Sequence, residues 1–298
     1  MTPGVRSPGE GRPAAGDPPF PRLGIAGIGL IGGSIALAAR RAWPGLTIIG
    51  VDRGPAAAQA KAQGVVDDIR ASVADLDDAD LVIFAAPVDA NLALLHEAAA
   101  ARLGALVTDA GSTKRAIVDA ASRLGLTRFI GGHPIAGAER GGLERARPDL
   151  FVDRPWALIR APGQESDLQL LETFVRGLGA RPAIMSADVH DRVMAYVSHV
   201  PQLLAVALMN AAGRELGDAA LSVAGRAFRE MTRLAESPED LWRGIAGANA
   251  DFIAEALDAL ARELPAPGAS LADGSWTRTA FPSAHAWRER LNAFGPVS

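Results

Sequence analysis

The sequence predicts an α/β N-terminal domain built on a doubly wound parallel sheet, followed by an all-α C-terminal domain. From Leu23 onward, short apolar runs alternate with helical segments, and after Ile184 this alternation gives way to helical patterns alone. The length of 298 residues is sufficient for two domains with sizeable cores. We therefore place the sheet domain at residues 22–185 and the helical domain at residues 186–298.

Residues 1–21 contain six Pro, four Gly and few large apolar side chains, so a disordered extension is expected there. The run Leu23–Ala39 is apolar but contains five glycines, which favour a strand, a turn and a helix in succession over a membrane span. Because strands alternate with helices, the sheet should be parallel and covered on both faces. Strands are expected at residues 23–28, 47–51, 81–86, 105–108, 129–132 and 156–159.

The helical domain begins at Ser186, which suits an N-cap, and Pro201 should kink the first helix. Another helix should start at Ser237–Pro238 and run through Leu257, and a short closing helix is expected around His285–Phe294 after a loop. Such apolar helices suit a core or a dimer interface equally well, and we expect a homodimer through this domain. In the first helix, five apolar residues at helical spacing predict one buried stripe: Val193, Val197, Val200, Leu204 and Leu208.

Composition excludes several classes of function. The chain has no Cys, so it offers no disulfide framework, thiolate-bound metal or thiol nucleophile, and a cytoplasmic location is expected. Thirty Lys plus Arg stand against 34 Asp plus Glu, a net charge of -4 that lacks the basic footprint of a nucleic-acid-binding protein. We expect a small-molecule substrate, no nucleic acid, no membrane and no metal site.

A dinucleotide site is predicted where the first strand meets the first helix, as in a Rossmann domain. Gly27, Gly29 and Gly32 form GxGxxG, which lets a pyrophosphate approach backbone N–H groups at a helix N-terminus. Asp52 lies 20 residues beyond Gly32, where a carboxylate binds the ribose hydroxyls of NAD and repels the 2′-phosphate of NADP. NAD is therefore the expected cofactor. The expected cofactor-binding residues are Gly27, Gly29, Leu30, Ile31, Gly32, Asp52, Arg53, Ala86 and Pro87.

Two further strand ends carry polar residues, in the segments 109–114 and 131–139. Ligands of doubly wound sheets bind at the carboxyl ends of the strands. His133 follows a strand and precedes Pro134, and a neutral imidazole can remove the proton of an alcohol. The sequence thus combines a hydride acceptor's site with a general base, which indicates a dehydrogenase.

In these segments the chain resembles the prephenate and arogenate dehydrogenases of tyrosine biosynthesis, from about residue 22 to residue 262. The resemblance rests on GIGLIGGS at 27–34, DAGSTK at 109–114, GGHPIAGAERGG at 131–142, HDRVMAYVSHVPQ at 190–202 and FREMTRLAESPEDLW at 228–242. It implies NAD-dependent oxidative decarboxylation of a cyclohexadienol. Ser112 and His133 match the pair at the substrate hydroxyl, His199 and Arg233 match substrate-binding residues, and Glu139 matches an acidic residue near the entrance.

Two histidines of the helical domain compete for a place in the site. His190 and His199 are nine residues apart, half a turn out of phase on a regular helix, so we assign His199 to the substrate and a structural role beside Asp191 to His190. Arg226 and Arg229 share a helical spacing with Arg233, but Arg233 alone matches the family motif.

Alternatives remain open. In the segment 225–228, Gly-Arg-Ala-Phe replaces a glycine-rich turn, which leaves the choice between prephenate and arogenate undecided. Another two-domain dehydrogenase, acting on a β-hydroxyacid or an imine, would usually carry a catalytic lysine on its helical domain, and residues 188–260 contain none. The third alternative is a non-catalytic NAD-binding regulator.

Overall fold

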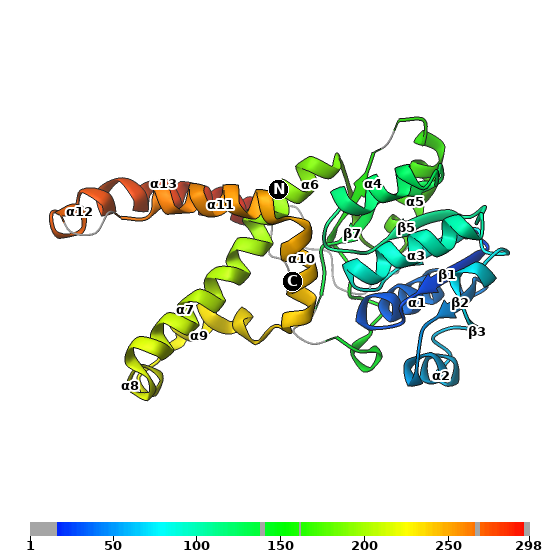
Figure 1. The fold of residues 1–298 in the computed structure, drawn as a ribbon, viewed down its shortest axis with the longest axis horizontal. Coiled ribbons are helices and arrows are strands. Elements are labelled where there is room, and N and C mark those ends of the chain that lie inside the picture. Colours follow the sequence, from blue (N-terminus) through cyan, green and yellow to red (C-terminus); the bar gives the residue numbers. More distant parts are fainter. Residues whose placement is uncertain (1–16, 138–140, 161, 266–268, 295–298) are drawn as a thin grey trace, which may run out of the picture. The chain divides into compact units, whose positions relative to one another are not determined.

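The computed structural model describes two compact units of the chain (Figure 1). The sheet unit comprises Met1–Asp191 and Arg233–Ala248, and the helical unit comprises Arg192–Thr232 and Asn249–Ser298. The predicted division after residue 185 differs from these units, because it assigned residues 186–191 and 233–248 to the helical domain. The described residues are 17–137, 141–160, 162–265 and 269–294.

Six parallel strands form the main sheet, in the order β3-β2-β1-β4-β5-β6. This is the doubly wound order of dinucleotide-binding domains, and it confirms the predicted fold class. The strands are β1 (Arg22–Ala26), β2 (Thr47–Val51), β3 (Asp68–Arg70), β4 (Leu81–Phe84), β5 (Leu106–Asp109) and β6 (Phe129–Ile130). The helices between them are α1 (Leu30–Ala42), α2 (Pro55–Ala62), the 3₁₀ turn η1 (Val73–Asp75), α3 (Val88–Ala100) and α4 (Arg115–Arg123).

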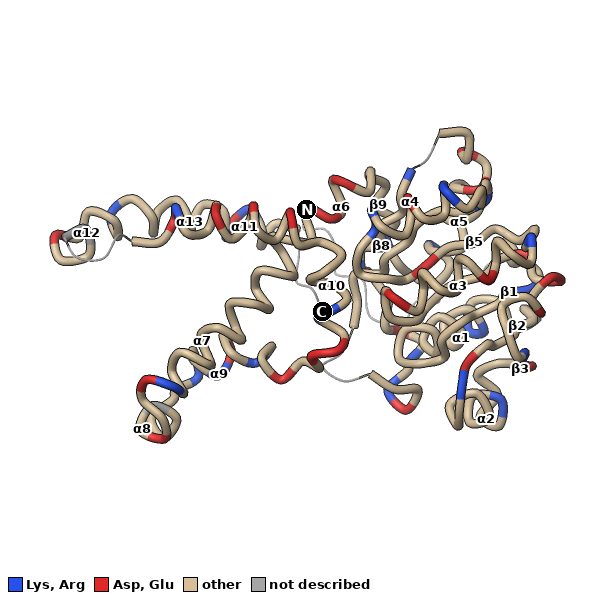
Figure 2. The backbone as a smooth tube through the Cα atoms, in the orientation of Figure 1, with Lys and Arg blue, Asp and Glu red and all other residues tan. Residues whose placement is uncertain are grey.

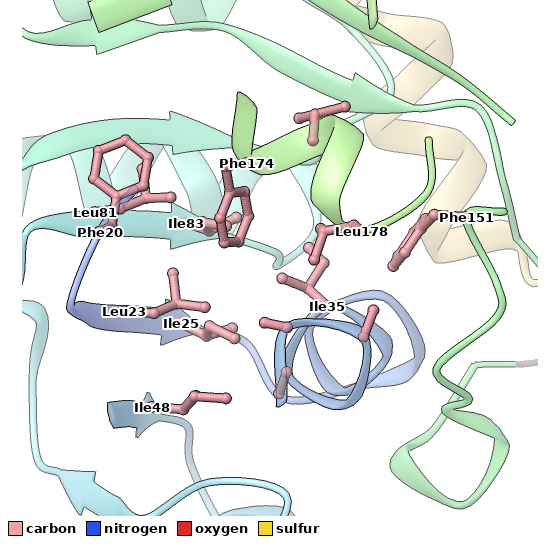
Figure 3. Packing of buried hydrophobic residues seen from close by; sticks show 14 of the residues in the cluster. Phe20, Leu23, Ile25, Ile35, Ile48, Leu81, Ile83, Phe151, Phe174 and Leu178 are labelled. Carbon is pink, nitrogen blue, oxygen red and sulfur yellow. The ribbon is translucent and has the colours of Figure 1, made fainter. Parts of the chain in front are cut away.

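The central strands of the main sheet are buried on both faces, because their side chains are mostly apolar. Successive side chains of a strand point to opposite faces, so β4 sends Leu81 and Ile83 into one core and Val82 and Phe84 into the other. Figure 3 shows the first of these cores, in which Leu23 and Ile25 of β1 lie near Ile35 of α1 and Phe174 of α5 (Glu165–Gly177). Two packed cores fix the strand ends, where the candidate site lies.

A second sheet of three strands was not predicted. It contains β7 (Gly132–Pro134), β8 (Pro155–Ile159) and β9 (Arg181–Met185), and β7 runs antiparallel to β8. Only Gly131 separates β6 from β7, and a Cβ on Gly132 would lie 2.6 Å from the backbone oxygen of Asp109. The two glycines therefore let the chain pass from one sheet to the other in close contact with the end of β5. The 3₁₀ turn η2 (Leu143–Arg145) lies between β7 and β8.

The predicted N-terminal extension, residues 1–21, is wrong at its C-terminal end. Residues 1–16 lie outside the described residues. Phe20, however, is buried and packs edge-on against Phe174, with ring centroids 6.1 Å apart. Burial of this aromatic side chain contributes on the order of 2 kcal/mol toward ordering the segment, and the backbone oxygen of Pro21 also accepts the N–H of Thr47.

The first helix of the helical domain is divided by a π-helix. It starts at α6 (Ala187–Met194), where the Oγ of Ser186 accepts the N–H of Val189, as expected of an N-cap. A π-helical turn, η3 (Ala195–His199), precedes α7 (Val200–Leu216). The stretch Ala187–Leu216 is long and apolar enough, by length and composition alone, to cross a membrane.

The predicted buried stripe of this helix is wrong within the described chain. Val200 is buried, but Val193, Val197, Leu204 and Leu208 are exposed. The helix itself was predicted correctly, but no described residues of this chain cover its exposed apolar side chains. The remaining helices are α8 (Asp218–Ser222), α9 (Arg226–Thr232), the 3₁₀ turn η4 (Arg233–Glu236), α10 (Glu239–Ala248), α11 (Ala250–Glu263), α12 (Ala269–Ala272) and α13 (Ser275–Ala293).

Two helix predictions need correction. The helix expected to run from Ser237 through Leu257 is two helices, because the chain breaks at Asn249 between α10 and α11. The closing helix starts at Ser275, ten residues before the expected His285, and continues through Pro282. A proline inside a helix removes one backbone hydrogen bond but does not always end the helix.

Candidate active site

The glycine turn has the shape that a dinucleotide pyrophosphate needs. Gly27 has a φ of +96°, and a Cβ on Gly32 would lie 1.9 Å from the Gly27 carbonyl oxygen, so both positions require glycine. A Cβ on Gly29 would meet no atom within 4 Å. Of the described residues, none caps α1 with a side chain, and its first turn contains no acid. Open space thus lies beside free helix N–H groups, as an anion site requires.

Asp52 follows β2 and is tied to the glycine turn. Its Oδ2 accepts the N–H of Ile28 at 2.5 Å and its Oδ1 accepts the N–H of Arg53 at 2.6 Å. Each carboxylate oxygen can still accept another hydrogen bond, which suits a pair of ribose hydroxyls. The structure therefore places Asp52 beside the turn, as predicted from its spacing.

The other predicted cofactor residues surround the same turn. Ala86 follows β4, and a Cβ on Gly27 would lie 3.0 Å from the Ala86 nitrogen. The side chain of Leu30 is buried in the first core, so its contribution to a ligand would come from the backbone. Arg53 and Pro87 are exposed and Ile31 is half-buried.

Asp109, at the end of β5, forms an ion pair with Lys114, and both residues are fully buried. Both side chains also contact the backbone of Gly132, at the start of β7. The Nζ of Lys114 also donates to the Gly132 carbonyl at 2.7 Å, and the Gly132 N–H donates to Oδ1 of Asp109 at 3.0 Å. Burial lowers the pKa of Lys114 from its usual value, and the Asp109 carboxylate opposes that shift. This pair fixes the loop that carries Ser112, which is half-buried, next to the strand that carries His133.

His133 is hydrogen-bonded to a second imidazole, that of His190, a contact that was not predicted. The Nδ1 of His133 lies 2.9 Å from Nε2 of His190, and Nδ1 of His190 lies 2.7 Å from Oδ1 of Asp191. His190 and Asp191 are fully buried. The His-Asp dipeptide in the matched segment 190–202 was the available signal, and the assumption of a regular helix hid it.

His199 is buried in the helical unit and lies 3.1 Å, Nδ1 to Nδ2, from Asn249. Asn249 was not predicted as a functional residue. Its signal was an amide within an apolar helical run, at the position where α10 ends and α11 begins. A buried amide of this kind orients the imidazole that it contacts.

Two predicted site residues remain, Arg233 and Glu139. Arg233 is exposed and starts η4, whereas Arg226 and Arg229 belong to α9, so the three arginines do not share one regular helix. Arg226 forms an exposed ion pair with Glu230. Glu139 lies outside the described residues. No group of metal-binding side chains occurs in the described part of the chain.

Comparison with known families decides which dehydrogenase this site resembles. A model of the prephenate dehydrogenase nucleotide-binding domain matches residues 35–184, and a model of the prephenate dehydrogenase dimerization domain matches residues 186–279. The two matches span most of the chain. This chain belongs to the prephenate dehydrogenase family. The family resemblance predicted from the sequence motifs is thereby confirmed.

Individual members of the prephenate dehydrogenase family match over most of the chain. Prephenate dehydrogenase of Bacillus subtilis (strain 168) is 37% identical over 251 residues, which cover 80% of this chain and 67% of that protein. A crystal structure of prephenate dehydrogenase from Aquifex aeolicus with hydroxyphenyl propionate and NAD+ has a TM-score of 0.83 at 26% identity, covering 91% of this chain and 98% of that chain. Synechocystis arogenate dehydrogenase has a TM-score of 0.72 at 28% identity, with the same coverage of both chains.

Proposed function

We propose that this chain catalyses the NAD-dependent oxidative decarboxylation of prephenate to 4-hydroxyphenylpyruvate, or of arogenate to tyrosine, in tyrosine biosynthesis. The observation that carries the proposal is the pair of strand-end features in one unit: a glycine turn with Asp52 beside it, and an imidazole, His133, backed by a second imidazole. Family membership and relatives that act on both substrates support it.

The residues present fit NAD, and Gly29 and Asp52 would hold its pyrophosphate and its ribose. When bound, NAD supplies the acceptor for the hydride that leaves the substrate ring. His133 takes the proton of the ring hydroxyl, and Ser112 orients that hydroxyl. Loss of the ring carboxylate as carbon dioxide is driven by formation of an aromatic ring.

The remaining site residues are proposed to bind the substrate. Arg233 offers a planar pair of N–H donors to a substrate carboxylate. His199, held by Asn249, would contact the substrate as well, and Glu139 would lie near the entrance. The segment 225–228 is proposed to determine whether prephenate or arogenate is preferred, since the two substrates differ in the polar end of the side chain.

The test is direct. Purified protein is incubated with NAD and either prephenate or arogenate, reduction of NAD is followed by absorbance, and the product is identified by mass spectrometry. The His133→Asn variant should lose a factor of roughly 10² to 10⁴ in kcat while its affinity for NAD is unchanged. Turnover of a β-hydroxyacid or an imine instead, or NAD binding with no turnover of either substrate, would contradict the proposal.

We also propose a cytoplasmic homodimer assembled through the helical unit. The second matching model is described as a dimerization domain, and large apolar side chains are exposed along α7 and α13. A second copy of the chain would cover them, which also accounts for the apolar character of the stretch Ala187–Leu216. Figure 2 shows Lys and Arg interspersed with Asp and Glu along both units, as suits a soluble enzyme of small molecules.

A further inference from the structure

Behind the proposed base, His133, lie two buried groups to which the proposed reaction assigns no role, and the three side chains form a row. His133 is half-buried, whereas His190 and Asp191 are fully buried. The two imidazole rings meet edge to face, with centroids 5.1 Å apart and an angle of 68° between the rings. One nitrogen of each ring is therefore aimed at its neighbour, and the row ends at a carboxylate.

The carboxylate end of the row is held as an anion. Oδ1 of Asp191 accepts the N–H of Lys114 at 2.7 Å, and Oδ2 accepts the N–H of Arg115 at 2.9 Å. Burial by itself raises the pKa of Asp191, but the hydrogen bonds from His190, Arg115 and Lys114 outweigh it, so the pKa is below its usual value. Asp191 can then only accept hydrogen bonds.

This anion determines which nitrogen of each ring carries the proton. Nδ1 of His190 must donate to Asp191, which leaves its Nε2 as an acceptor when the ring is neutral. The Nδ1 of His133 must then be the donor between the two rings. The remaining nitrogen of His133, Nε2, then carries no proton in the neutral ring, and a base must present such an unprotonated nitrogen to a hydroxyl.

We propose that His190 and Asp191 are positioning residues for His133, holding its imidazole in the tautomer with an unprotonated Nε2 and offsetting the charge that it gains. The inference rests on the proposed function. When the O–H bond of the substrate breaks, its proton binds Nε2 of His133, and the resulting imidazolium keeps its Nδ1–H bond to His190. Asp191 supplies the compensating negative charge beyond His190, a logic shared with carboxylate-imidazole pairs in serine hydrolases.

Two described cations also lie close to Asp191, namely Arg115 and Lys114. The guanidinium of Arg115 lies 3.4 Å from Oδ2 of Asp191, on the side away from His190, whose bond is to Oδ1. Lys114 is paired with Asp109, so its charge is balanced locally. Loss of His190 should thus remove the contact through which the charge of Asp191 reaches His133.

The test compares two substitutions of His190 that differ in one property. The His190→Gln variant keeps an acceptor for the His133 Nδ1–H, and the His190→Leu variant does not. We expect kcat to fall roughly tenfold in His190→Gln and roughly 10² to 10³ in His190→Leu, with KM for NAD and substrate within about threefold. Both variants lose the imidazole that links His133 to the carboxylate of Asp191, so the His133 imidazolium is less stabilised and the acidic limb of the kcat profile should move to lower pH in both. The exposed His96→Gln is the matched control and should behave as wild type.

A merely structural His190 would give another pattern. If folded His190→Leu keeps the kcat and the pH profile of the wild type, or if both variants lose only stability or KM, the inference is wrong. Should His190→Leu fail to fold, His190→Gln still decides, because its acidic limb must shift.

A measurement without turnover separates this inference from the proposed function. In wild-type protein labelled with ¹⁵N-histidine, the signals of His133 and His190 are assigned by their absence from His133→Asn and His190→Gln. The expected pattern is a proton on Nδ1 and none on Nε2 for both rings near neutral pH. A proton on Nε2 of His133 would overturn the inference even in an enzyme that turns over prephenate. The expected pattern in a protein that turns over neither substrate would leave the geometry correct and the proposed function wrong.

Discussion

At the scale of single residues, the carboxylate of Asp52 has two tasks. Its carboxylate holds the N–H groups of Ile28 and Arg53, and in the proposed enzyme it also binds the ribose hydroxyls of NAD. The first task concerns the local turn and the second concerns the ligand. Both depend on the same two oxygen atoms.

The Asp52→Ala variant should raise KM for NAD by roughly tenfold or more, because a charge-assisted hydrogen bond is worth about 1.5–3 kcal/mol. KM for NADP should change less, since the repulsion of its 2′-phosphate is removed as well. Steady-state kinetics with both cofactors measure the ratio of KM for NAD to KM for NADP. Asp119→Ala, at an exposed position of α4, is the control. A wild-type preference for NADP would refute the assignment of Asp52.

Arg233 is the residue expected to bind a substrate carboxylate. Lysine keeps the charge but loses the planar pair of donors, so Arg233→Lys should raise KM for the substrate by roughly tenfold and leave the affinity for NAD unchanged. Arg229→Lys, in the last turns of α9 and also exposed, should be close to neutral. Equal effects of the two substitutions on KM would show that Arg233 has no special role.

The sequence predicted the residues whose role depends on their place along the chain. Asp52 and His133 were selected because each was expected to follow a strand; Asp52 follows β2, whereas His133 lies within the short strand β7. The contact of His190 with His133 was not predicted, because the two residues are 57 positions apart in the chain. A π-helical turn between His190 and His199 also invalidates the phase calculated for a regular helix. Long-range pairing of this kind leaves no periodic pattern in the sequence.

At the scale of elements, the turn that opens α1 separates binding from folding. Gly29→Ala should leave the free energy of unfolding within about 0.5 kcal/mol, because its Cβ meets no atom of the protein. The same Cβ would occupy the space that a pyrophosphate approaches, so we expect the affinity for NAD to fall roughly tenfold or more. Gly32→Ala should instead lose about 1–3 kcal/mol or more of stability, because its Cβ would overlap the Gly27 carbonyl oxygen.

Chemical denaturation and titration with NAD measure the two effects of these glycine variants separately. Wild-type affinity for NAD in Gly29→Ala would show that no phosphate comes close to this turn. Wild-type stability in Gly32→Ala would show that the turn relaxes more easily than its backbone contact implies.

Asp191 also ties the start of α4 to α6, and its contribution to stability depends on pH. Its pKa is lower in the folded chain than in the unfolded chain, so the stability it provides is complete above the unfolded pKa and is lost as pH falls through the folded pKa. We expect Asp191→Asn to cost about 1–3 kcal/mol near neutral pH. The difference from wild type should shrink as pH falls below about 4.

Urea unfolding across this pH range measures the free-energy difference between wild type and Asp191→Asn. Asp119→Asn, exposed on α4, should show a small difference that changes little with pH. A cost of Asp191→Asn that is constant down to low pH would mean that the negative charge is not what stabilises the start of α4.

Strands with continuous apolar runs could be predicted, whereas short strands and strands with exposed or charged residues could not. Strands β1, β2, β4 and β5 have continuous apolar runs, which is why their positions were recognised. Strand β3 is three residues with two charged side chains, and β9 has two exposed positions, so neither shows a strand pattern. The break at Asn249 was missed because apolar residues continue at helical spacing on both sides of it.

At the scale of the whole molecule, the exposed apolar side chains of the helical unit predict that the protein is a dimer. Leu204 and Leu208 lie one turn apart on α7 and are both exposed in the single chain. If a second copy covers them, the double variant Leu204→Glu/Leu208→Glu should sediment as a monomer where the wild type sediments as a dimer. Leu170→Glu, at an equally exposed position of α5 in the sheet unit, should remain a dimer. Dimers from both variants would exclude this face of α7 from the interface.

The junction Gly131–Gly132 limits where the enzyme can be redesigned. A side chain at Gly132 would press on the Asp109 backbone, and one at Gly131 would lie about 3 Å from Val118 and Ile159. Library positions chosen here for a new substrate would mostly yield unfolded clones rather than altered specificity. Diversity is better introduced at residues 225–227, which are exposed, so that added volume meets solvent instead of the junction of two sheets.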